Sequence, residues 1–334
     1  MKRLASIKHF SLAPCLLVTA GCTTSLDLPK TASGVVQTAT VPASPWAPSG
    51  LPMFDGENGR TSTWADLMDR IAAARVIVLG EEHDDEVAHR FQLAVVEQTI
   101  ATWPDTAVAL EMVERDQQAA LDAYLAGEST RSAFLETVRS SEKSRERFTT
   151  SSLPIIDAAA AMNAPVIAAN APRRFVTMAR LEGWDALEAR DGDERALFVI
   201  PDSIHQGAYR RRLEDLMQEN GVEPTTERID AVLRAQQVWD STMADSTLQA
   251  LDGATKVILI VGRFHGDFGG GTIEELHRHA PFLDVCYVST INEDARTLLE
   301  DDEDRADLVV YTGGVPRGSE PIDPVDDRPV DEDA

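Results

Sequence analysis

The most constraining feature of this sequence is a short apolar run that ends in a polar cluster. Val76–Leu79 reads VIVL, an unbroken stretch rich in β-branched residues. Such a run is typical of a strand buried on both faces of a parallel sheet. Gly80 ends the strand, and apolar residues at helical spacing begin near Asp85. The polar residues from Glu81 onward therefore fall at the carboxyl end of a strand, where open α/β sheets bind their ligands.

The polar cluster places several carboxylates beside one imidazole, His83. Such carboxylates repel one another unless a cation lies between them or some are protonated. A metal ion would satisfy this need, because His and Asp/Glu are common metal ligands. Asp84 and Asp85 are better explained as the N-cap and first-turn acids of the following helix. Glu81 and His83 precede that cap and are the stronger candidates for a site.

A second stretch repeats this arrangement. Val257–Val261 is another apolar run typical of a buried strand, and Gly262 and His265 follow it in the same Gly-x-x-His spacing before a helical stretch. One such motif is a weak signal. Two of them at equivalent strand-to-helix junctions are stronger, because neighbouring parallel strands would bring both histidines to one edge of the sheet.

A third strand, predicted over residues 106–112, adds a further carboxylate near its end, Glu111. A carboxylate in a buried strand needs a partner or a ligand. The predicted metal-ligand set is therefore Glu81, His83, Glu111 and His265. The residues alone predict a carboxylate-rich site with two histidines, and they do not name its ligand.

The order of several short motifs resembles that of the haem-binding ChaN family, within the broader Tiki/TraB/erythromycin-esterase group. The resemblance extends from about Trp64 to Ser289. The matching segments are LGEEH with the downstream His89 and Gln92, the strand Ala109–Met112, the turn Ala168–Pro172 and the helix Gln237–Ala244. The loop after His265 departs from the family pattern, because Gly269–Ile273 replaces its usual Gly-Val-Pro element.

The pattern of runs predicts an α/β fold with a mostly parallel sheet flanked by helices. The predicted domain covers residues 61–312. Between about 202 and 251 no strand signal is present, and two long helices there suggest a small helical subdomain over the sheet edge. Residues 313–334 are acidic and rich in Gly and Pro, which is typical of a disordered tail.

The N-terminus has the features of a bacterial lipoprotein signal. Basic residues precede a short apolar run, and small residues then lead to Cys22. We therefore expect residues 1–21 to be a signal peptide, Cys22 to be lipidated and residues 22–60 to be a flexible tether. Thr23 follows the cysteine, which for this class implies sorting to the outer membrane.

Composition excludes some functions. The chain of 334 residues carries a formal net charge of -25, which disfavours binding to the backbone of nucleic acids. Apart from Cys15 in the signal and Cys22, the chain has one cysteine, Cys286, so no pair remains for a disulfide.

The resemblance implies a haem-binding protein that takes part in iron uptake. The lipid anchor would attach it to the membrane. A haem receptor or a second copy of the chain would be its partner. The residues predicted to contact haem are His83, His265, Arg173, Tyr209 and Met243. His205 and Arg174 are further candidates. The alternative is a hydrolase of the Tiki kind, in which Glu81, His83, Glu111 and His265 hold a divalent ion that activates water, or in which His83 is the base without a metal. The sequence does not decide whether the protein is an enzyme.

Overall fold

The structure is a computed structural model that describes residues 50–139 and 141–313. The predicted signal peptide, the lipidation site Cys22 and nearly all of the predicted tail lie outside these residues, as does most of the predicted tether. Within the described ranges, no helix is both long enough and apolar enough to cross a membrane.

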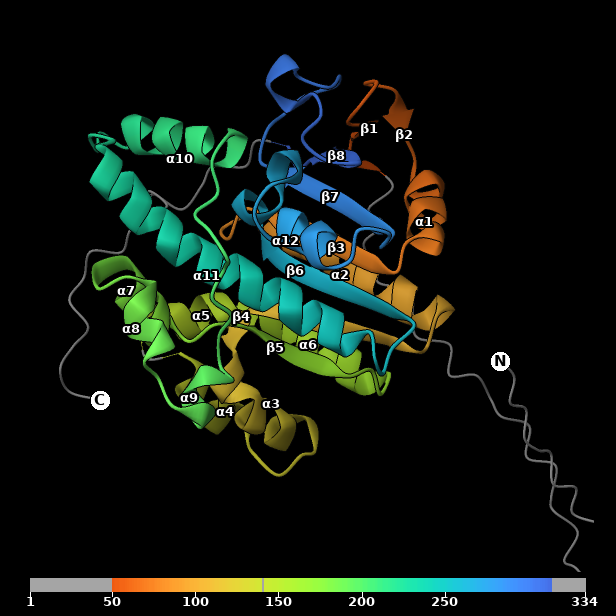
Figure 1. Cartoon of the computed structure of the whole chain (residues 1–334). Helices are drawn as coiled ribbons and strands as arrows, with labels where there is room; N and C mark the ends of the chain where they lie inside the picture. The colour runs from red at the N-terminus through yellow and green to blue at the C-terminus, as the bar shows by residue number, and fades with distance from the viewer. Residues whose placement is uncertain (1–49, 140, 314–334) are drawn as a thin grey trace, which may run out of the picture. The chain divides into compact units, whose positions relative to one another are not determined.

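An eight-stranded sheet forms the centre of the domain (Figure 1). Its order is β2-β1-β8-β7-β3-β6-β4-β5, and every neighbouring pair from β8 to β5 is parallel. This confirms the predicted mostly parallel sheet. The strands are β1 (Met53–Asp55), β2 (Thr61–Ser62), β3 (Val76–Glu81), β4 (Thr106–Glu114), β5 (Val166–Asn170), β6 (Lys256–Gly262), β7 (Val285–Ile291) and β8 (Leu308–Tyr311).

Helices flank the sheet, as predicted. They are α1 (Trp64–Ala73), α2 (Glu86–Thr102), α3 (Gln118–Leu125), α4 (Arg131–Val138), α5 (Glu142–Thr150), α6 (Ser152–Ala161), α7 (Arg173–Leu181), α8 (Trp184–Glu188), α9 (Gly192–Arg195), α10 (Ala208–Glu219), α11 (Thr226–Ala250) and α12 (Thr272–His279). Short 3-10 turns are η2 (Arg115–Gln117), η3 (Arg263–His265), η4 (Asp267–Gly269) and η5 (Glu300–Asp302).

Several boundaries differ from the prediction. β1 lies inside the stretch predicted as tether, because Met53 and Phe54 are buried and pair with β8. β3 continues through Gly80 to Glu81, and β4 continues past residue 112 to Glu114. Between β4 and β5, the side chains of Thr130 and Ser141 each cap the start of a separate helix, α4 and α5.

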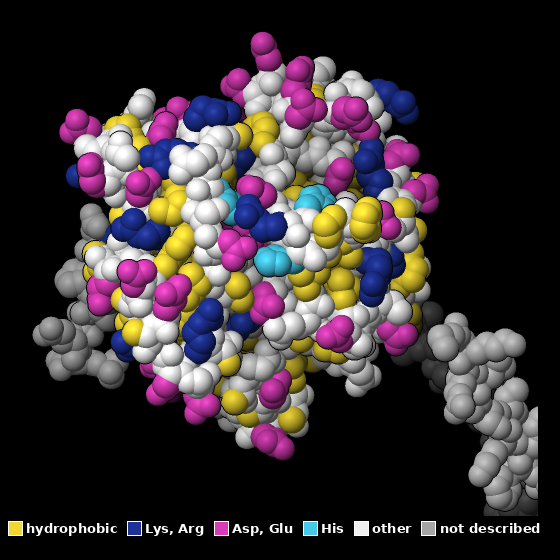
Figure 2. Space-filling view, viewed as in Figure 1, with side chains coloured by type: hydrophobic (Ala, Val, Ile, Leu, Met, Phe, Trp, Pro, Cys, Tyr) yellow, Lys and Arg dark blue, Asp and Glu magenta, His cyan; other side chains and the backbone are white. Residues whose placement is uncertain are grey.

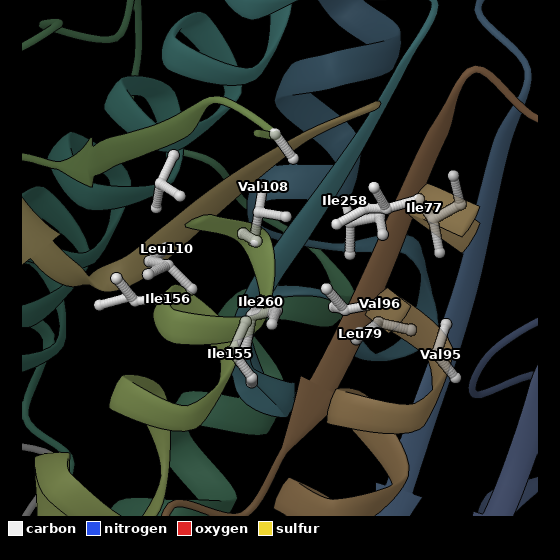
Figure 3. Packing of buried hydrophobic residues seen from close by; sticks show 14 of the residues in the cluster. Ile77, Leu79, Val95, Val96, Val108, Leu110, Ile155, Ile156, Ile258 and Ile260 are labelled. Carbon is white, nitrogen blue, oxygen red and sulfur yellow. The ribbon is translucent and has the colours of Figure 1, made fainter. Parts of the chain in front are cut away.

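Alternate residues of the central strands supply two apolar layers. Ile77 and Leu79 of β3 face one layer, in which Val95 and Val96 of α2 and residues of α6 pack against the sheet (Figure 3). The intervening strand residues face the other layer, which α11 and α12 cover (Figure 1). Because the sheet is buried on both sides, polar side chains of the central strands gather at its carboxyl edge.

The helix pair α10–α11 is partly separate and partly a cover for the sheet. The first half of α11 and α10 share their own apolar cluster, which comprises Tyr209, Leu213, Met217, Ile229, Val232 and Leu233. The second half of α11 packs on the sheet through Met243 and Ala244. Residues 202–251 contain no strand, as predicted. Only α10 and the first half of α11 form a cluster separate from the sheet.

Candidate functional site

The ends of β3, β4 and β6 bring the four predicted ligands together. Glu81 ends β3 and pairs in register with Gly262, which ends β6. His83 follows β3, Glu111 lies on β4 and His265 ends the turn η3 after β6. The prediction that both Gly-x-x-His motifs meet at the carboxyl edge of the sheet is therefore confirmed by the fold.

The carboxylate of Glu81 lies between two histidines. Its Oε1 is 3.0 Å from His83 Nδ1, and its Oε2 is 3.4 Å from Nε2 of His89 on α2. The second contact is close enough for an ion pair but is not aligned as a hydrogen bond. The Glu81 side chain is buried, so it depends on these two partners for its charge.

Glu81 and His83 form an ion pair at neutral pH. Burial favours the neutral form of Glu81, but the hydrogen bond from His83 and the contact with His89 lower the pKa of Glu81 to about 2. Burial also opposes the charge on His83, yet the bond to Glu81 and the charge of Glu111 raise the pKa of His83 to about 9. Both shifts describe the same interaction, in which each charge stabilises the other.

Glu111 lies between the two motif histidines. Its Oε2 accepts the backbone N–H of Gly262 at 2.5 Å, and its Oε1 lies 3.7 Å from His265 Nε2. A Cβ atom added at Gly262 would lie 3.0 Å from the His83 ring and 3.5 Å from Glu111 Oε2. The glycine is therefore required for this close approach of an imidazole, a carboxylate and the backbone.

Asp240 of α11 holds the second histidine. Its Oδ1 lies 2.7 Å from His265 Nδ1 and accepts a bond from the hydroxyl of Thr272 at 2.9 Å. Its Oδ2 accepts the hydroxyl of Tyr209 at 2.8 Å. Burial opposes the charge on His265, but Asp240 and Glu111 raise its pKa above the usual value.

These groups form two contact sets, His89–Glu81–His83 and Glu111–His265–Asp240–Tyr209. The charge of Glu111 acts on His83 across the space between them. Together we call them the histidine–carboxylate row: His89, Glu81, His83, Glu111, His265, Asp240 and Tyr209. Two of its members, Asp240 and His89, were not assigned to the site from the sequence. The signal for Asp240 was present, because an acidic residue on the inner face of a predicted helix needs a buried partner.

Access to the row is uneven. The His83 side chain is 32% exposed, whereas that of Glu111 is 11% and that of His265 is 8% exposed. Both motif histidines direct Nδ1 at a carboxylate, which leaves Nε2 for another partner. This is the arrangement in which protein histidines bind metal centres. His83 is therefore the imidazole of the row that a ligand in solution can reach.

The loop after β6 is held in place by Asp267. Its Oδ1 accepts hydroxyl groups of Tyr287 at 2.7 Å and Ser289 at 2.8 Å. Its Oδ2 pairs with Arg263 at 2.8 Å and also with Arg305. The loop that carries His265 is thus anchored from β7 and from the segment before β8.

The other residues predicted to contact haem lie farther inside the fold or have partners. Tyr209 is buried; burial first, and then Asp240, raises its pKa well above the usual value, which opposes the phenolate form that iron binds. Met243 is fully buried between α11 and the sheet. The Arg173 guanidinium lies 5.9 Å from the ring centre of Trp239, whose ring meets that of His265 edge-on at 6.3 Å.

His205 belongs to a separate cluster on α12. Figure 2 shows histidine, acidic and basic side chains gathered over this helix. His205 is buried, with Nε2 2.8 Å from Glu275 Oε1 and Nδ1 3.3 Å from Glu274 Oε2. Nη2 of Arg278 also lies 2.7 Å from its Nε2, so His205 fastens its loop to α12.

No group of three or more His, Cys, Asp or Glu side chains among the described residues is arranged to hold a metal ion. The predicted set of Glu81, His83, Glu111 and His265 is brought together as a row, and its members pair with one another. Its role as a metal site stays a prediction.

Comparison with known proteins agrees with the ordered motifs. The family described as "Haem-binding uptake, Tiki superfamily, ChaN" matches residues 67–276, a span that includes both Gly-x-x-His motifs. The chain is a member of the ChaN family. No curated protein sequence matches it significantly.

Among the solved structures that match, one shares the fold of this chain. This structure, described as cofacial haem binding to ChaN of Campylobacter jejuni, has a TM-score of 0.59 and 17% identity, and the match covers 78% of this chain and 96% of that one. A type III effector matches with a TM-score of 0.45 and 13% identity over 77% of this chain and 98% of the effector. An erythromycin esterase mutant in its open conformation matches with a TM-score of 0.40 and 12% identity over 71% of this chain and 76% of the esterase.

Proposed function

We propose that this protein binds haem. Membership of the ChaN family supports the proposal, as does the description of the C. jejuni ChaN structure as a haem complex. The observation that carries the proposal is the partial exposure of His83 together with its contact to Glu81. The His83 side chain is partly exposed, and its Nδ1 is held by Glu81, so Nε2 is the atom that would bind the haem iron.

Other residues near the row fit the remaining needs of haem. Haem requires apolar walls and cationic partners for its propionates. The rings of Trp239 and Phe264 both lie edge-on to His265. The Arg173 guanidinium at the start of α7 lies 5.9 Å from the ring centre of Trp239, whose ring meets that of His265. This position makes Arg173 the candidate for a propionate.

The proposed cellular role follows from the N-terminal sequence. Lipidation at Cys22 would tether the domain to the bacterial outer membrane, where it would take part in haem and iron uptake. A haem receptor or a second copy of this chain would be its partner. Metabolic labelling with a radioactive fatty acid tests the anchor, since Cys22→Ser should abolish incorporation if the proposal holds.

Titration with hemin tests the proposed function. The purified full chain is titrated and the haem absorbance band is followed, with His83→Ala and His279→Ala as variants. His279 is a matched control because it is exposed and contacts Glu275 on α12, away from the row. A saturable shift that His83→Ala weakens and His279→Ala preserves would support the proposal. No saturable shift in the wild-type protein would overturn it.

A second candidate function is hydrolysis, and one observation favours it. Glu111 lies between two imidazoles of raised pKa, an arrangement suited to moving a proton to or from a bound water. His83 would act as the base only in its neutral form. The rate should therefore rise with pH towards about 9, where His83 titrates.

Glu111→Gln separates the two functions. The amide keeps the shape of the side chain but removes its charge, so it should abolish hydrolysis of a panel of ester substrates. Haem binding through His83 should survive the change. An esterase activity that is absent in the wild-type protein at every pH would remove this candidate.

A further inference from the structure

An exposed aromatic ring stands on the loop next to the row. Phe268 is 36% exposed, and its backbone adopts φ 58° and ψ 30°, the left-handed region that bulky residues avoid. Such a conformation is strained and persists only where neighbouring contacts impose it. Those contacts are present here, because Asp267 is anchored by the residues given above and the backbone N–H of Phe268 donates to the backbone carbonyl of Arg305 at 2.7 Å.

Two guanidinium groups flank this ring. The Cζ of Arg305 lies 4.6 Å from the ring centre of Phe268, and that of Arg212 lies 5.3 Å from it. The loop thus presents an apolar ring beside two guanidinium groups, of which Arg305 is also paired with Asp267 and Asp302. Glycine would adopt the same backbone without strain, so the fold itself does not call for a phenylalanine at this position.

Arg212 connects this ring to the row. Its Cζ lies 5.3 Å from the ring of Tyr209 and 5.4 Å from that of Phe264, and its Nη atoms donate to backbone carbonyls of the loop. Its Nε is buried without a hydrogen-bond partner in the described part of the chain. An orphaned donor of this kind calls for an explanation. Because the atom is buried, the Arg212 side chain would have to turn outward for a ligand carboxylate to supply the missing acceptor.

We propose that Phe268, flanked by Arg212 and Arg305, is a stacking surface for the porphyrin ring of haem, with the ring face on Phe268 and a carboxylate near Arg212. The inference rests on the proposed haem-binding function and assigns residues to it that the sequence did not indicate. A flat aromatic dianion matches both the exposed ring and the cations beside it.

The test uses Phe268→Gly and Phe268→Asn, two residues that tolerate the left-handed conformation. The full chain is titrated with hemin and with metal-free protoporphyrin IX, and the melting temperature is measured alongside. Loss of one stacking contact should weaken both ligands about threefold to tenfold, while the melting temperature is unchanged or rises because strain is removed. Phe282→Gly is the control, since Phe282 is 98% exposed in the loop between α12 and β7.

The charged part of the surface is tested with Arg212→Gln and the dimethyl ester of protoporphyrin IX. The wild-type protein should prefer the free acid, and the variant should lose that preference.

Wild-type affinity in both Phe268 variants would overturn the stacking surface and leave the proposed function intact. A lower melting temperature in both would show that the ring is structural and would also overturn it. Failure of the wild-type protein to bind either porphyrin would overturn the inference together with the proposed function.

Discussion

Asp240 Oδ1 lies 2.7 Å from His265 Nδ1, although Asp240 belongs to α11 and His265 to the turn after β6. Asp240 is thereby the link between the α10–α11 pair and the carboxyl edge of the sheet. It fixes the ring orientation of His265 and leaves Nε2 directed at Glu111.

Asp240→Asn should lower the pKa of His265, because burial opposes the imidazolium charge and Asp240 is the largest influence that raises the pKa. The variant should also lose about 1–3 kcal/mol of unfolding free energy, since Asp240 is the buried partner of His265, Thr272 and Tyr209. NMR titration of the histidine ring signals and urea denaturation measure the two effects. Asp245→Asn on the same helix is the control, because its pair with Arg115 is more exposed. Equal losses in both variants would contradict the assigned role.

The Glu81–His83 pair should make stability depend on pH in both directions. The pKa of Glu81 is lowered from 4.5 to about 2, so its contribution is present above 4.5 and is lost as the pH falls towards 2. The pKa of His83 is raised from 6.5 to about 9, so its contribution is present below 6.5 and is lost as the pH rises through 9.

The melting temperature should therefore be highest between the two unfolded-state values and should fall on either side. In His83→Gln the alkaline fall should be smaller, because the group that loses its proton is gone. A wild-type melting temperature that stays level from neutral pH to beyond the pKa of His83 would contradict the ion pair.

Gly262→Ala should disturb the row by sterics alone. The added Cβ would lie 3.0 Å from Cε1 and Nε2 of His83, a distance that real Cβ atoms rarely show, so the ring must move. We expect a loss of about 1–3 kcal/mol in unfolding free energy and weaker hemin binding. Gly253→Ala is the matched control, since a Cβ there would meet no atom within 4 Å. Hemin affinity that is unaffected by Gly262→Ala would show that the ligand does not depend on the position of His83.

Local patterns were sufficient to predict most of the sheet. The runs around Val78 and Leu259 are apolar on both faces, and Glu81 and Gly262 end their strands in register. The placement of His83 and His265 at one edge therefore follows from parallel pairing. Glu111 could be placed for the same reason. These residues lie within or beside the strands that position them, and the sequence carries that relationship directly.

The rest of the site depends on tertiary packing that no local pattern encodes. The rotation of α11 over the sheet decides that Asp240 meets His265, whereas Met243, one turn later, enters the core. β1 escaped prediction because three residues are too few to show a period and its partner β8 lies at the far end of the domain. Phe268 gave no signal, since its left-handed backbone follows from the contacts of Asp267 and Arg305.

The most direct test of haem binding through His83 is the hemin affinity of the full chain measured between about pH 6.5 and 8.5. Iron binds the neutral imidazole, and His83 in the ligand-free protein has a pKa of about 9. The dissociation constant should therefore fall about tenfold for each unit of pH in this range, and His83→Ala should bind more weakly and without this slope. An affinity that is independent of pH, or a slope that persists in His83→Ala, would contradict the assignment of His83 as the iron ligand.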